Sequence, residues 1–366
     1  MIVKFFDYPK LYQEHARDYD FIIKKTLSKG SYILQDELSS FESNLKNYLS
    51  AKDVVGVADG TNALILSLIA LNISAGDEVI LPSHTYIATA SAVKFVGAKP
   101  ILCECNNDSS ISIDDLKNKV NSRTKLIIPV NLNGKCSDLD LIIKLKKKYN
   151  KLLILEDSAQ GLGSKLNNKH AGTFGDLGTI SFYPAKTLGC FGDGGAIIIN
   201  NSKYKKKIRM LRDHGRNDKG HVEIWGTNSR LDNLQAAILD FKLKKLSNYI
   251  NKRQQIANIY DKLDELEEVH IPKKNDSRYY NSYQNYECLF KNRDSLKLFL
   301  NKKGIGTLVQ WNGKALHHFK KLDLKNFILP NTDLFFKKCL MLPMNTFISN
   351  KQARYVVKSI YEFYNK

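Results

Sequence analysis

The sequence predicts an α/β protein: a large domain with a mostly parallel β-sheet, followed by a smaller α/β domain. Short apolar strands alternate with helices through the first half of the 366-residue chain, which is typical of a parallel sheet covered on both faces. A long helical stretch follows, and the last ~100 residues repeat strand and helix patterns on a smaller scale. The length of the chain suits two such domains.

The elements of the large domain follow one another in a regular order. Strands are expected at residues 53–58, 77–83, 99–105, 124–131, 151–157 and 194–200. Helices are expected between them at residues 59–72, 84–98, 112–120 and 139–150. The strands are rich in Val, Ile and Leu, as strands buried on both faces are. In such sheets, ligands bind at the carboxyl ends of the strands.

The second half of the chain contains fewer strands. A basic helix is followed by residues 231–266, which carry apolar side chains at helical spacing. Strand and helix patterns of the smaller domain occupy residues 282–290, 294–304 and 307–311. We therefore expect residues 1–245 to form the N-terminal segment and large domain, and residues 246–366 the small domain. The first ~30 residues are expected to fold back near one of the two domains.

The composition is that of a soluble globular protein, with 43% hydrophobic residues. No apolar run is long enough to span a bilayer, and the first residues lack the apolar region of a signal peptide. A cytoplasmic location without a membrane partner is therefore expected. The six cysteines contain no CxxC pair, so they are expected to be reduced and mostly buried.

The net charge of +19 leaves three interpretations open. It could mark a nucleic-acid or membrane surface, help to attract a doubly charged small substrate, or be a lysine-rich background on solvated helix faces. The basic runs "KLKKKYNK" and "KYKKKIR" lie on amphipathic patterns and lack the interleaved aromatic residues of single-strand binders. Background composition is favoured, and no nucleic-acid partner is predicted.

Two short motifs at predicted strand ends suggest an anion site and an acid. Gly60 and Thr61, in "DGTN", begin a helix whose first N–H groups suit a phosphate; alternatively Thr61 is an ordinary N-cap. The segment "ILEDSAQ" ends a buried strand with Glu156 and Asp157, and buried acids need partners. Asp157 could pair with a protonated ring nitrogen or cap a helix.

Two further motifs complete the set. In "SFYPAKTLGCFGDGGAIIIN", Lys186 lies between a strand and a glycine-rich turn. A lysine at the edge of a sheet, near a phosphate site and an acid, suits Schiff-base chemistry, although most lysines are solvated and a lone one would be structural. In "GTNSRLDNLQAA", Asn228 and Arg230 precede a long helix, and alone this is a plain helix start. The argument depends on the order of all four motifs.

In this order the motifs resemble the DegT/DnrJ/EryC1/StrS family of pyridoxal-phosphate sugar aminotransferases, which have fold type I, that of aspartate aminotransferase. The similarity covers nearly the whole chain and includes "GSYILQDELSSFE", "HTYIATASAVKFVGAKP", "LRDHGR" and "MLPM". It implies a seven-stranded sheet, pyridoxal phosphate cycling through pyridoxamine phosphate, and a homodimer with sites shared across the interface. Gln35 stands where the family commonly has Gly, which leaves the shape of the entry loop open.

The resemblance also implies roles for individual residues. Lys186 would hold the cofactor as a Schiff base and move the proton, and Asp157 would hold the pyridine nitrogen. The other implied cofactor contacts are Gln160 to the phenolic oxygen, Tyr86 stacked on the ring, Gly60, Thr61 and Ser181 to the phosphate, and Asn228 from the second subunit. Their structural alternatives are a core aromatic for Tyr86, a capping side chain for Gln160 and a backbone-bonding serine for Ser181. No metal is predicted.

Substrate contacts are expected from variable regions. Arg216, Lys219 and His221 could hold a substrate with two or more negative charges. The stretch "VQWNGKALHHFKKL" is unusual for the family, and its Trp311, Lys314 and His317 could shape the sugar pocket; Tyr32 is a further candidate. The alternative for these residues is a solvated loop or local packing.

The function implied is transfer of an amino group from an amino acid, expected to be glutamate, to a keto sugar. A nucleotide-linked keto-deoxyhexose is expected, for the amino sugars of lipopolysaccharide, another surface polysaccharide or a glycoconjugate. A keto sugar without a nucleotide, such as an oxidised octulosonate, is the alternative. A sugar dehydratase is disfavoured, because such family members carry His at the position of Lys186. A nucleic-acid-binding protein, suggested by the charge alone, is also disfavoured. The sequence names neither the sugar nor the carbon that is aminated.

Overall fold

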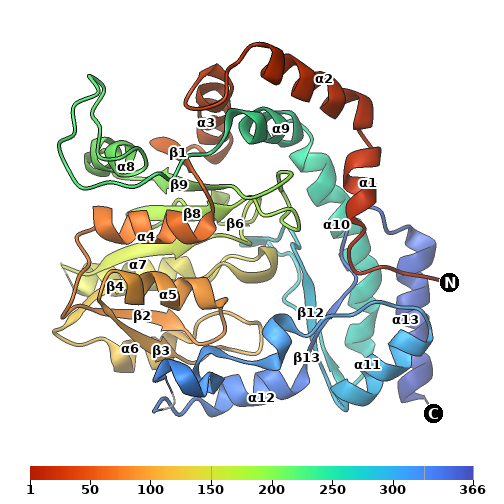
Figure 1. Ribbon diagram of the computed structural model, residues 1–366. Coiled ribbons are helices and arrows are strands. Elements are labelled where there is room, and N and C mark those ends of the chain that lie inside the picture. Colours follow the sequence, from red (N-terminus) through yellow and green to blue (C-terminus); the bar gives the residue numbers. More distant parts are fainter. Residues whose placement is uncertain (150, 325, 366) are drawn as a thin grey trace.

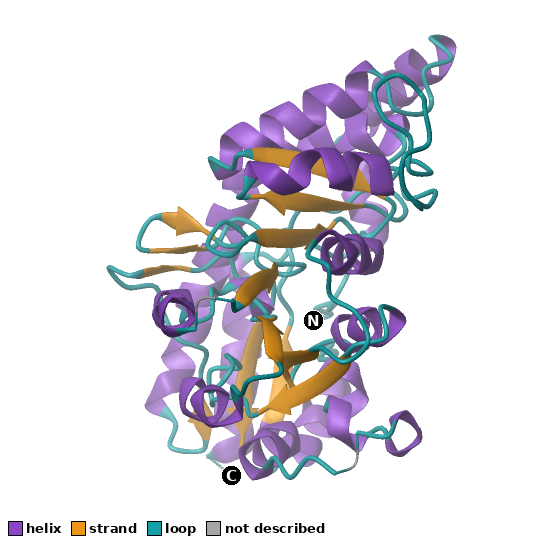
Figure 2. Cartoon of the chain, turned by 90° about the vertical axis from the view of Figure 1, so that its left-hand side faces the viewer, coloured by secondary structure: helices purple, strands orange, loops and turns teal. Residues whose placement is uncertain are grey.

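The computed structural model describes residues 1–149, 151–324 and 326–365. It shows a large sheet between two layers of helices, with a smaller sheet and its helices at one end (Figures 1 and 2). The predicted helix at residues 139–150 includes Asn150, which lies outside the described residues.

The large sheet has seven strands in the order β1-β9-β8-β5-β4-β2-β3. They are β1 (Asp53–Val57), β2 (Glu78–Pro82), β3 (Lys99–Cys103), β4 (Thr124–Ile127), β5 (Leu153–Asp157), β8 (Leu177–Ser181) and β9 (Gly195–Ile199). The neighbours from β8 to β3 are parallel, and β9 runs antiparallel to both β1 and β8. The predicted seven-stranded, mostly parallel sheet is confirmed.

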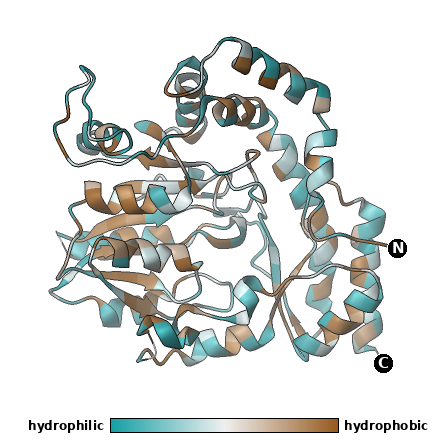
Figure 3. Ribbon diagram, in the orientation of Figure 1, coloured by the Kyte–Doolittle hydropathy of each residue, from teal (hydrophilic) through white to brown (hydrophobic). Residues whose placement is uncertain are grey.

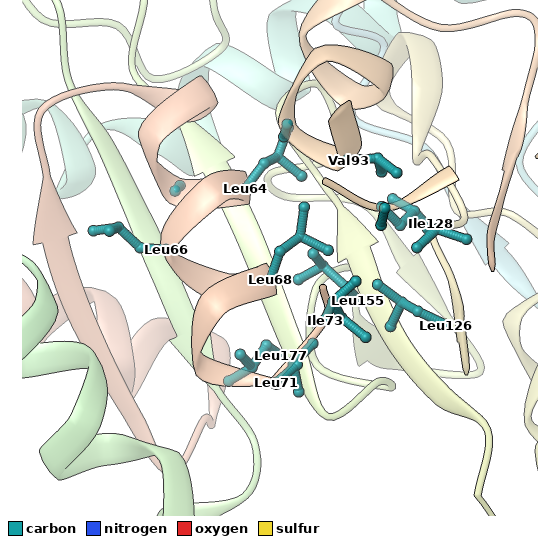
Figure 4. Packing of buried hydrophobic residues seen from close by; sticks show 14 of the residues in the cluster. Leu64, Leu66, Leu68, Leu71, Ile73, Val93, Leu126, Ile128, Leu155 and Leu177 are labelled. Carbon is teal, nitrogen blue, oxygen red and sulfur yellow. The ribbon is translucent and has the colours of Figure 1, made fainter. Parts of the chain in front are cut away.

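Helices cover both faces of this sheet because alternate strand residues point to opposite sides. The helices are α3 (Asp36–Leu49), α4 (Gly60–Ala70), α5 (Ile87–Phe95), α6 (Ile113–Lys119), α7 (Leu139–Lys148), α8 (Lys205–Leu211) and α9 (Asn233–Leu243). Leu155 packs under α4 and α5, whereas its neighbour Ile154 packs on the other face with α6 and α7. Figure 4 shows the first of these clusters, and Figure 3 shows apolar residues concentrated in the strands and in α4 and α5.

The second half of the chain builds a separate three-stranded antiparallel sheet. Its strands are β10 (Val269–His270), β12 (Tyr286–Phe290) and β13 (Cys339–Leu342), and its helices are α10 (Leu246–Tyr260), α11 (Arg293–Lys302), α12 (Pro330–Lys338) and α13 (Asn350–Tyr364). A third small sheet joins β11 (Tyr279–Tyr280) to β6 (Lys165–Leu166) and β7 (Lys169–His170). Short 3-10 helices are η1 (Leu132–Gly134), η2 (Ser202–Tyr204), η3 (Asp261–Glu265), η4 (Gln310–Gly313), η5 (Leu316–His318) and η6 (Lys320–Leu322).

The helical stretch predicted at residues 231–266 is two helices, α9 and α10, separated at Lys244 and Lys245, with η3 at its end. The two helices bury their apolar residues in different cores. Ala236 and Leu239 of α9 pack with the large sheet, whereas Ile256 of α10 packs with the small one. The predicted domain boundary at residue 245 coincides with this break. The division into domains itself stays a prediction, because β11 also crosses it to pair with β6.

The N-terminal segment contacts both halves, not one. Val3 forms a parallel bridge with Ile305 in the second half, while α2 (Ala16–Ser28), after α1 (Tyr8–Gln13), packs beside α9 (Figure 1). All six cysteines are buried and unpaired, as expected. No helix in the described part of the chain combines the length and apolar character needed to cross a membrane.

The core under α4 yields a prediction. Leu68 is fully buried in it, whereas its neighbour Ile69 is 36% exposed. Leu68→Ala removes buried methyl groups and leaves a cavity, so it should lower the free energy of unfolding by about 2–5 kcal/mol. Ile69→Ala is the control and should cost about 1 kcal/mol or less. Urea unfolding would measure both, and equal costs would contradict this packing.

Candidate active site

Four segments meet at one edge of the large sheet. Asp157 is the last residue of β5, and Ser181 is the last residue of β8. Ser181 pairs with Gly195, the first residue of β9, and Gly195 also pairs with Val57 at the end of β1. The start of α4 follows three residues after Val57. The sheet register therefore brings the predicted phosphate residues and the predicted acid to the same edge, as expected for a parallel sheet.

The backbone is closely packed at the start of α4. A Cβ atom on Gly60 would lie 2.9 Å from the Cβ of Ser181, and one on Gly195 would lie 2.4 Å from the carbonyl carbon of Asp59. Only glycine permits these approaches. The Asp59 side chain accepts a 2.8 Å hydrogen bond from the Asn62 N–H, so Asp59, not Thr61, is the N-cap.

This capping leaves donors for an anion. Within the described residues, the N–H groups of Gly60 and Thr61 and the Thr61 hydroxyl form no hydrogen bond. The Ser181 Oγ accepts a 3.3 Å bond from the Tyr183 N–H, which leaves its own hydroxyl hydrogen free to donate. The backbone-bonding role considered for Ser181 is therefore real, but it does not occupy the donor. These groups at a helix N-terminus fit a phosphate.

Asp157 is buried and only partly hydrogen-bonded. Its Oδ2 accepts a 2.8 Å bond from the Thr89 hydroxyl, and its Oδ1 accepts a 3.1 Å bond from the Ala159 N–H. Burial raises the pKa of this carboxyl, while these bonds and the charge of Lys186 act in the opposite direction. Each oxygen retains capacity for another donor, so the group can accept a hydrogen bond from a protonated ring nitrogen.

Lys186 lies in the turn after β8. Its side chain is half-buried, and its N–H donates a 2.8 Å bond to the Tyr183 carbonyl. Burial lowers the pKa of the amine to about 8, and the nearby Asp157 carboxylate partly offsets this. A lysine with a pKa in this range has a neutral fraction that can act as nucleophile or base near neutral pH.

Gln160 and Tyr86 border the same edge. The Gln160 Oε1 accepts a 3.0 Å bond from the Asn133 N–H and a 3.3 Å bond from the Asn285 side chain. Its amide nitrogen has no partner in the described chain and can donate to a ring oxygen. Tyr86 is the N-cap residue of α5 and is 57% exposed, which excludes the core-aromatic alternative.

The predicted substrate residues, and Asn228, lie in three separate places. Arg216, Lys219, His221 and Asn228 are exposed in the segment after α8, which projects from the body (Figure 1). Arg216 forms a 2.8 Å ion pair with Asp213. Asn228 forms a bridge with Asp213, and no hydrogen bond among the described residues links it to Lys186 or Asp157. Tyr32 is exposed in the segment before α3.

Trp311 and His317 lie instead above the end of β2. Trp311 packs edge-on against His84, and Lys314 is exposed. His317 is buried, with Nδ1 2.7 Å from the Ser83 Oγ and Nε2 2.8 Å from Asp333. Both nitrogens of His317 are therefore engaged, which matches the local-packing alternative.

His317, His318 and Asp333 are close enough to suggest a metal site in the described chain. However, the His318 Nδ1 accepts a 3.1 Å bond from the Ala315 N–H. A neutral ring in that arrangement carries its proton on Nε2, where it donates to Asp333 at 2.5 Å. A metal would need the Nε2 lone pair and an Nδ1–H donor. These hydrogen bonds instead suit a structural role, in which both histidines hold Asp333 of α12 in place.

The comparisons with known proteins match this geometry. A profile of the DegT/DnrJ/EryC1/StrS aminotransferase family matches residues 16–361. The chain is 33% identical to dTDP-3-amino-3,4,6-trideoxy-alpha-D-glucose transaminase of Streptomyces venezuelae, over 99% of this chain and 96% of that protein. It is 34% identical to UDP-2-acetamido-2-deoxy-3-oxo-D-glucuronate aminotransferase of Pseudomonas aeruginosa, over 92% and 94%. The solved structure of NtdA from Bacillus subtilis with bound pyridoxamine phosphate superposes with a TM-score of 0.93 at 27% identity, over 100% and 86% of the two chains.

The chain belongs to this family. It is a pyridoxal-phosphate-dependent sugar aminotransferase of fold type I, and the cofactor cycles through pyridoxamine phosphate. The site of the aminotransferase fits the cofactor. The close backbone packing at Gly60 and Gly195 and the unbonded donors at the start of α4 suit a phosphate group. The incompletely bonded Asp157 can accept a hydrogen bond from a ring nitrogen. The free amide of Gln160 and the exposed ring of Tyr86 match the remaining contacts.

Sequence reasoning missed a polar network beneath the site. Thr89 bonds Asp157, and Thr89 is itself bonded to Thr85 at 2.8 Å. Both threonines lie four residues apart in the segment "HTYIATASAVKFVGAKP", but Thr85 precedes α5 and its N-cap Tyr86, so the short spacing was the one signal of this contact. The second part of the network centres on Asn133, whose side-chain amide donates to Glu287 at 2.8 Å and accepts from Gln310 at 2.6 Å. No local pattern in the sequence marks these contacts.

Burial favours the neutral form of Glu287 in this network. Burial raises its pKa to about 8, and its Oε1 has no partner in the described structure. His84, whose Nε2 lies 3.8 Å from the Glu287 Oε2, is held neutral because burial lowers its pKa to about 3. Burial thus favours the uncharged form of both groups over an ion pair.

This predicts a pH-dependent stability. Glu287 ionises near 4.5 in the unfolded chain and at about 8 in the folded one, so its stabilising contribution is full below pH 4.5 and is lost as pH rises to 8. Over this range, Glu287 lowers the free energy of unfolding by at most about 1.4 kcal/mol for each unit by which the pH rises. Glu287→Gln should remove that contribution in urea unfolding between pH 5 and 8. The exposed control Glu267→Gln should not, and a Glu287→Gln difference that is constant across this range would contradict the assignment.

Proposed function

We propose that this aminotransferase moves the amino group of glutamate to a nucleotide-linked keto sugar, using Lys186 and Asp157. The observation that carries the proposal is the placement of Lys186, with its lowered pKa, beside the buried and incompletely bonded Asp157. The two named relatives act on dTDP- and UDP-linked sugars, so a nucleoside diphosphate is the shared feature proposed for the substrate. A keto-deoxyhexose destined for a surface polysaccharide or glycoconjugate, and a cytoplasmic location, are part of the same proposal.

The residues of the chain divide the chemistry between them. Bound pyridoxal phosphate supplies an electron sink for the carbon that loses a proton. Lys186 is the group that anchors the cofactor and, once its amine is free, takes up and returns that proton. Asp157 holds the proton on the ring nitrogen, which requires the carboxylate form that its hydrogen bonds and Lys186 favour. Thr89 orients Asp157, and Gln160 donates to the ring oxygen.

Basic residues are proposed to bind the diphosphate. Arg216, Lys219 and His221 lie together in the projecting segment, and the backbone N–H groups of Lys219 and His221 both donate to the Asn217 side chain. This fixes the local turn and holds the basic residues near one another. Cationic side chains bind pyrophosphate through charge-assisted hydrogen bonds.

The projecting segment also supports a shared site in a homodimer. Trp225 is 98% exposed and Val222 is 68% exposed beside Asn228. Exposed large apolar residues that gather on one segment mark an interaction surface. We propose that this surface contacts a second copy, so that Asn228 reaches the phosphate in the site of the partner chain.

The proposed reaction can be tested with a panel of keto sugars and glutamate. The parent should convert a nucleotide-linked keto sugar to an amino sugar while producing 2-oxoglutarate. Lys186→Ala lacks the anchor and the proton shuttle and should lose at least about 10³-fold in turnover. Borohydride treatment of the parent with pyridoxal phosphate should fix the adduct on Lys186. An adduct mapped to another lysine, or full turnover by Lys186→Ala, would overturn the proposal.

The shared site predicts complementation between inactive variants. In a mixed dimer of Lys186→Ala and Asn228→Ala, one site collects both lesions and the other collects neither. Random mixing makes half of the dimers mixed, so about a quarter of all sites should be sound. Co-expression of two differently tagged chains would allow the exchange. Given that Asn228→Ala alone is clearly impaired, a mixture no more active than the mean of its parents would refute the shared site.

A further inference from the structure

The side chain of Gln284 brackets Lys186. Its Nε2 donates a 2.8 Å hydrogen bond to the carbonyl of Ala185, the residue before the lysine. Its Oε1 accepts from both the N–H and the hydroxyl of Thr187, the residue after it, at 2.5 and 2.7 Å. One amide group therefore fixes the peptide units on both sides of Lys186, although it lies 98 positions further along the chain.

Gln284 is itself held in place. It is 4% exposed and lies between β11 and β12. The Arg253 guanidinium of α10 donates to the carbonyls of Tyr283 and Gln284 at 3.2 and 3.0 Å, and to that of Met344 at 2.8 Å. A buried arginine that bonds three carbonyls from two segments locks the backbone around Gln284.

A second contact fixes this segment from the other side. Gly134 has a φ of +82°, and a Cβ atom there would lie 2.4 Å from the Gln284 backbone nitrogen. The Gly134 carbonyl also accepts a 2.8 Å bond from the Ser282 N–H. The segment therefore rests directly on the backbone of the large-sheet half. Its position cannot shift without breaking these contacts.

Lys186 needs such a support. Its amine has no hydrogen bond in the described chain, so the direction of its long side chain depends on the backbone from which it starts. Beyond Thr187, the loop is held by Lys242, which donates to the Gly189 carbonyl, and by Gln235, whose amide bonds the N–H of Phe191 at 2.9 Å. These supports lie three to five residues past the lysine. The Gln284 bracket is the one that touches both of its neighbours.

We propose that Gln284 is a positioning residue that orients Lys186 toward the cofactor, and so couples the small-sheet half of the chain to the catalytic amine. The inference rests on the proposed role of Lys186. Gln284 touches neither the cofactor nor the substrate in this assignment; it acts through the backbone of the lysine.

The test measures adduct formation and not turnover. Gln284→Met keeps the length and packing of the side chain but removes all three hydrogen bonds. Apo-protein would be titrated with pyridoxal phosphate, trapped with borohydride, and the adduct on Lys186 quantified by peptide mapping. The concentration giving half-maximal adduct should rise about tenfold. Gln235→Met is the matched control, since it loses the amide bonds to Phe191; its thermal midpoint should fall similarly while its adduct curve stays within about twofold of the parent.

A second variant separates positioning from stability. Gln284→Glu keeps an acceptor for Thr187 but can donate to Ala185 only when protonated. At pH 9, where a carboxyl is ionised and cannot donate, its adduct yield relative to the parent at the same pH should fall toward the Gln284→Met value. This ratio tests whether Gln284 positions Lys186 even if Gln284→Met does not fold.

The outcomes are distinct. A Gln284→Met adduct curve equal to that of the Gln235→Met control would overturn the inference, as would a Gln284→Glu ratio that stays near one at pH 9. If the parent forms its adduct on Lys186 in those experiments, the proposed function stands and only the role of Gln284 fails. If the parent adduct maps elsewhere, the proposed function fails with it.

Discussion

The end of β5 must accommodate two consecutive buried carboxylates, and the rest of the site depends on how each is satisfied. Glu156 and Asp157 point to opposite faces of the sheet because side chains alternate along a strand. Glu156 accepts from the N–H groups of Gly172, Phe174 and Gly175 and from the Asn131 side chain, at 2.5–3.1 Å. Burial raises its pKa, and these four donors oppose that shift. Glu156 is thereby saturated and organises the turn before β8.

Asp157 differs from its neighbour because, within the described residues, it has two donors, Thr89 and Ala159. A buried carboxylate with unused acceptor capacity is costly unless a cation or a donor completes it. The amine of Lys186 supplies part of that charge, and the protonated ring of the cofactor can supply the remainder. The same burial that raises the pKa of the acid lowers that of the lysine to about 8. The raised pKa of the acid and the lowered pKa of the lysine thus share one cause, which is the burial of both groups at the same edge of the sheet.

Much of the fold and part of the site could be predicted from the sequence because they depend on local signals. Strand and helix alternation fixes a parallel sheet, and the sheet brings Gly60, Asp157 and Ser181 to one edge whatever the details of the loops. The contacts of Gln284 and Asn133 could not be predicted. They join segments about a hundred or more positions apart, and a polar side chain in a loop carries no periodic pattern to show which distant backbone it meets. The break between α9 and α10 was missed for a related reason, since two cores, not a helix-breaking residue, separate them.

These distant contacts also set how freely the two halves of the chain can move. Gln284, Asn285 and Gln310 come from the small-sheet half, and each is hydrogen-bonded to the large-sheet half at a buried position. Opening the halves would leave buried donors and acceptors unpaired, at about 1–3 kcal/mol for each group. A hinge at this junction is therefore unfavourable. The exposed segment that carries Arg216 and Asn228 forms no hydrogen bond with Lys186 in the described chain, so it lies outside this rigid junction. The buried hydrogen bonds at the junction therefore make the backbone around Lys186 rigid, whereas exposed loops outside the junction are less constrained.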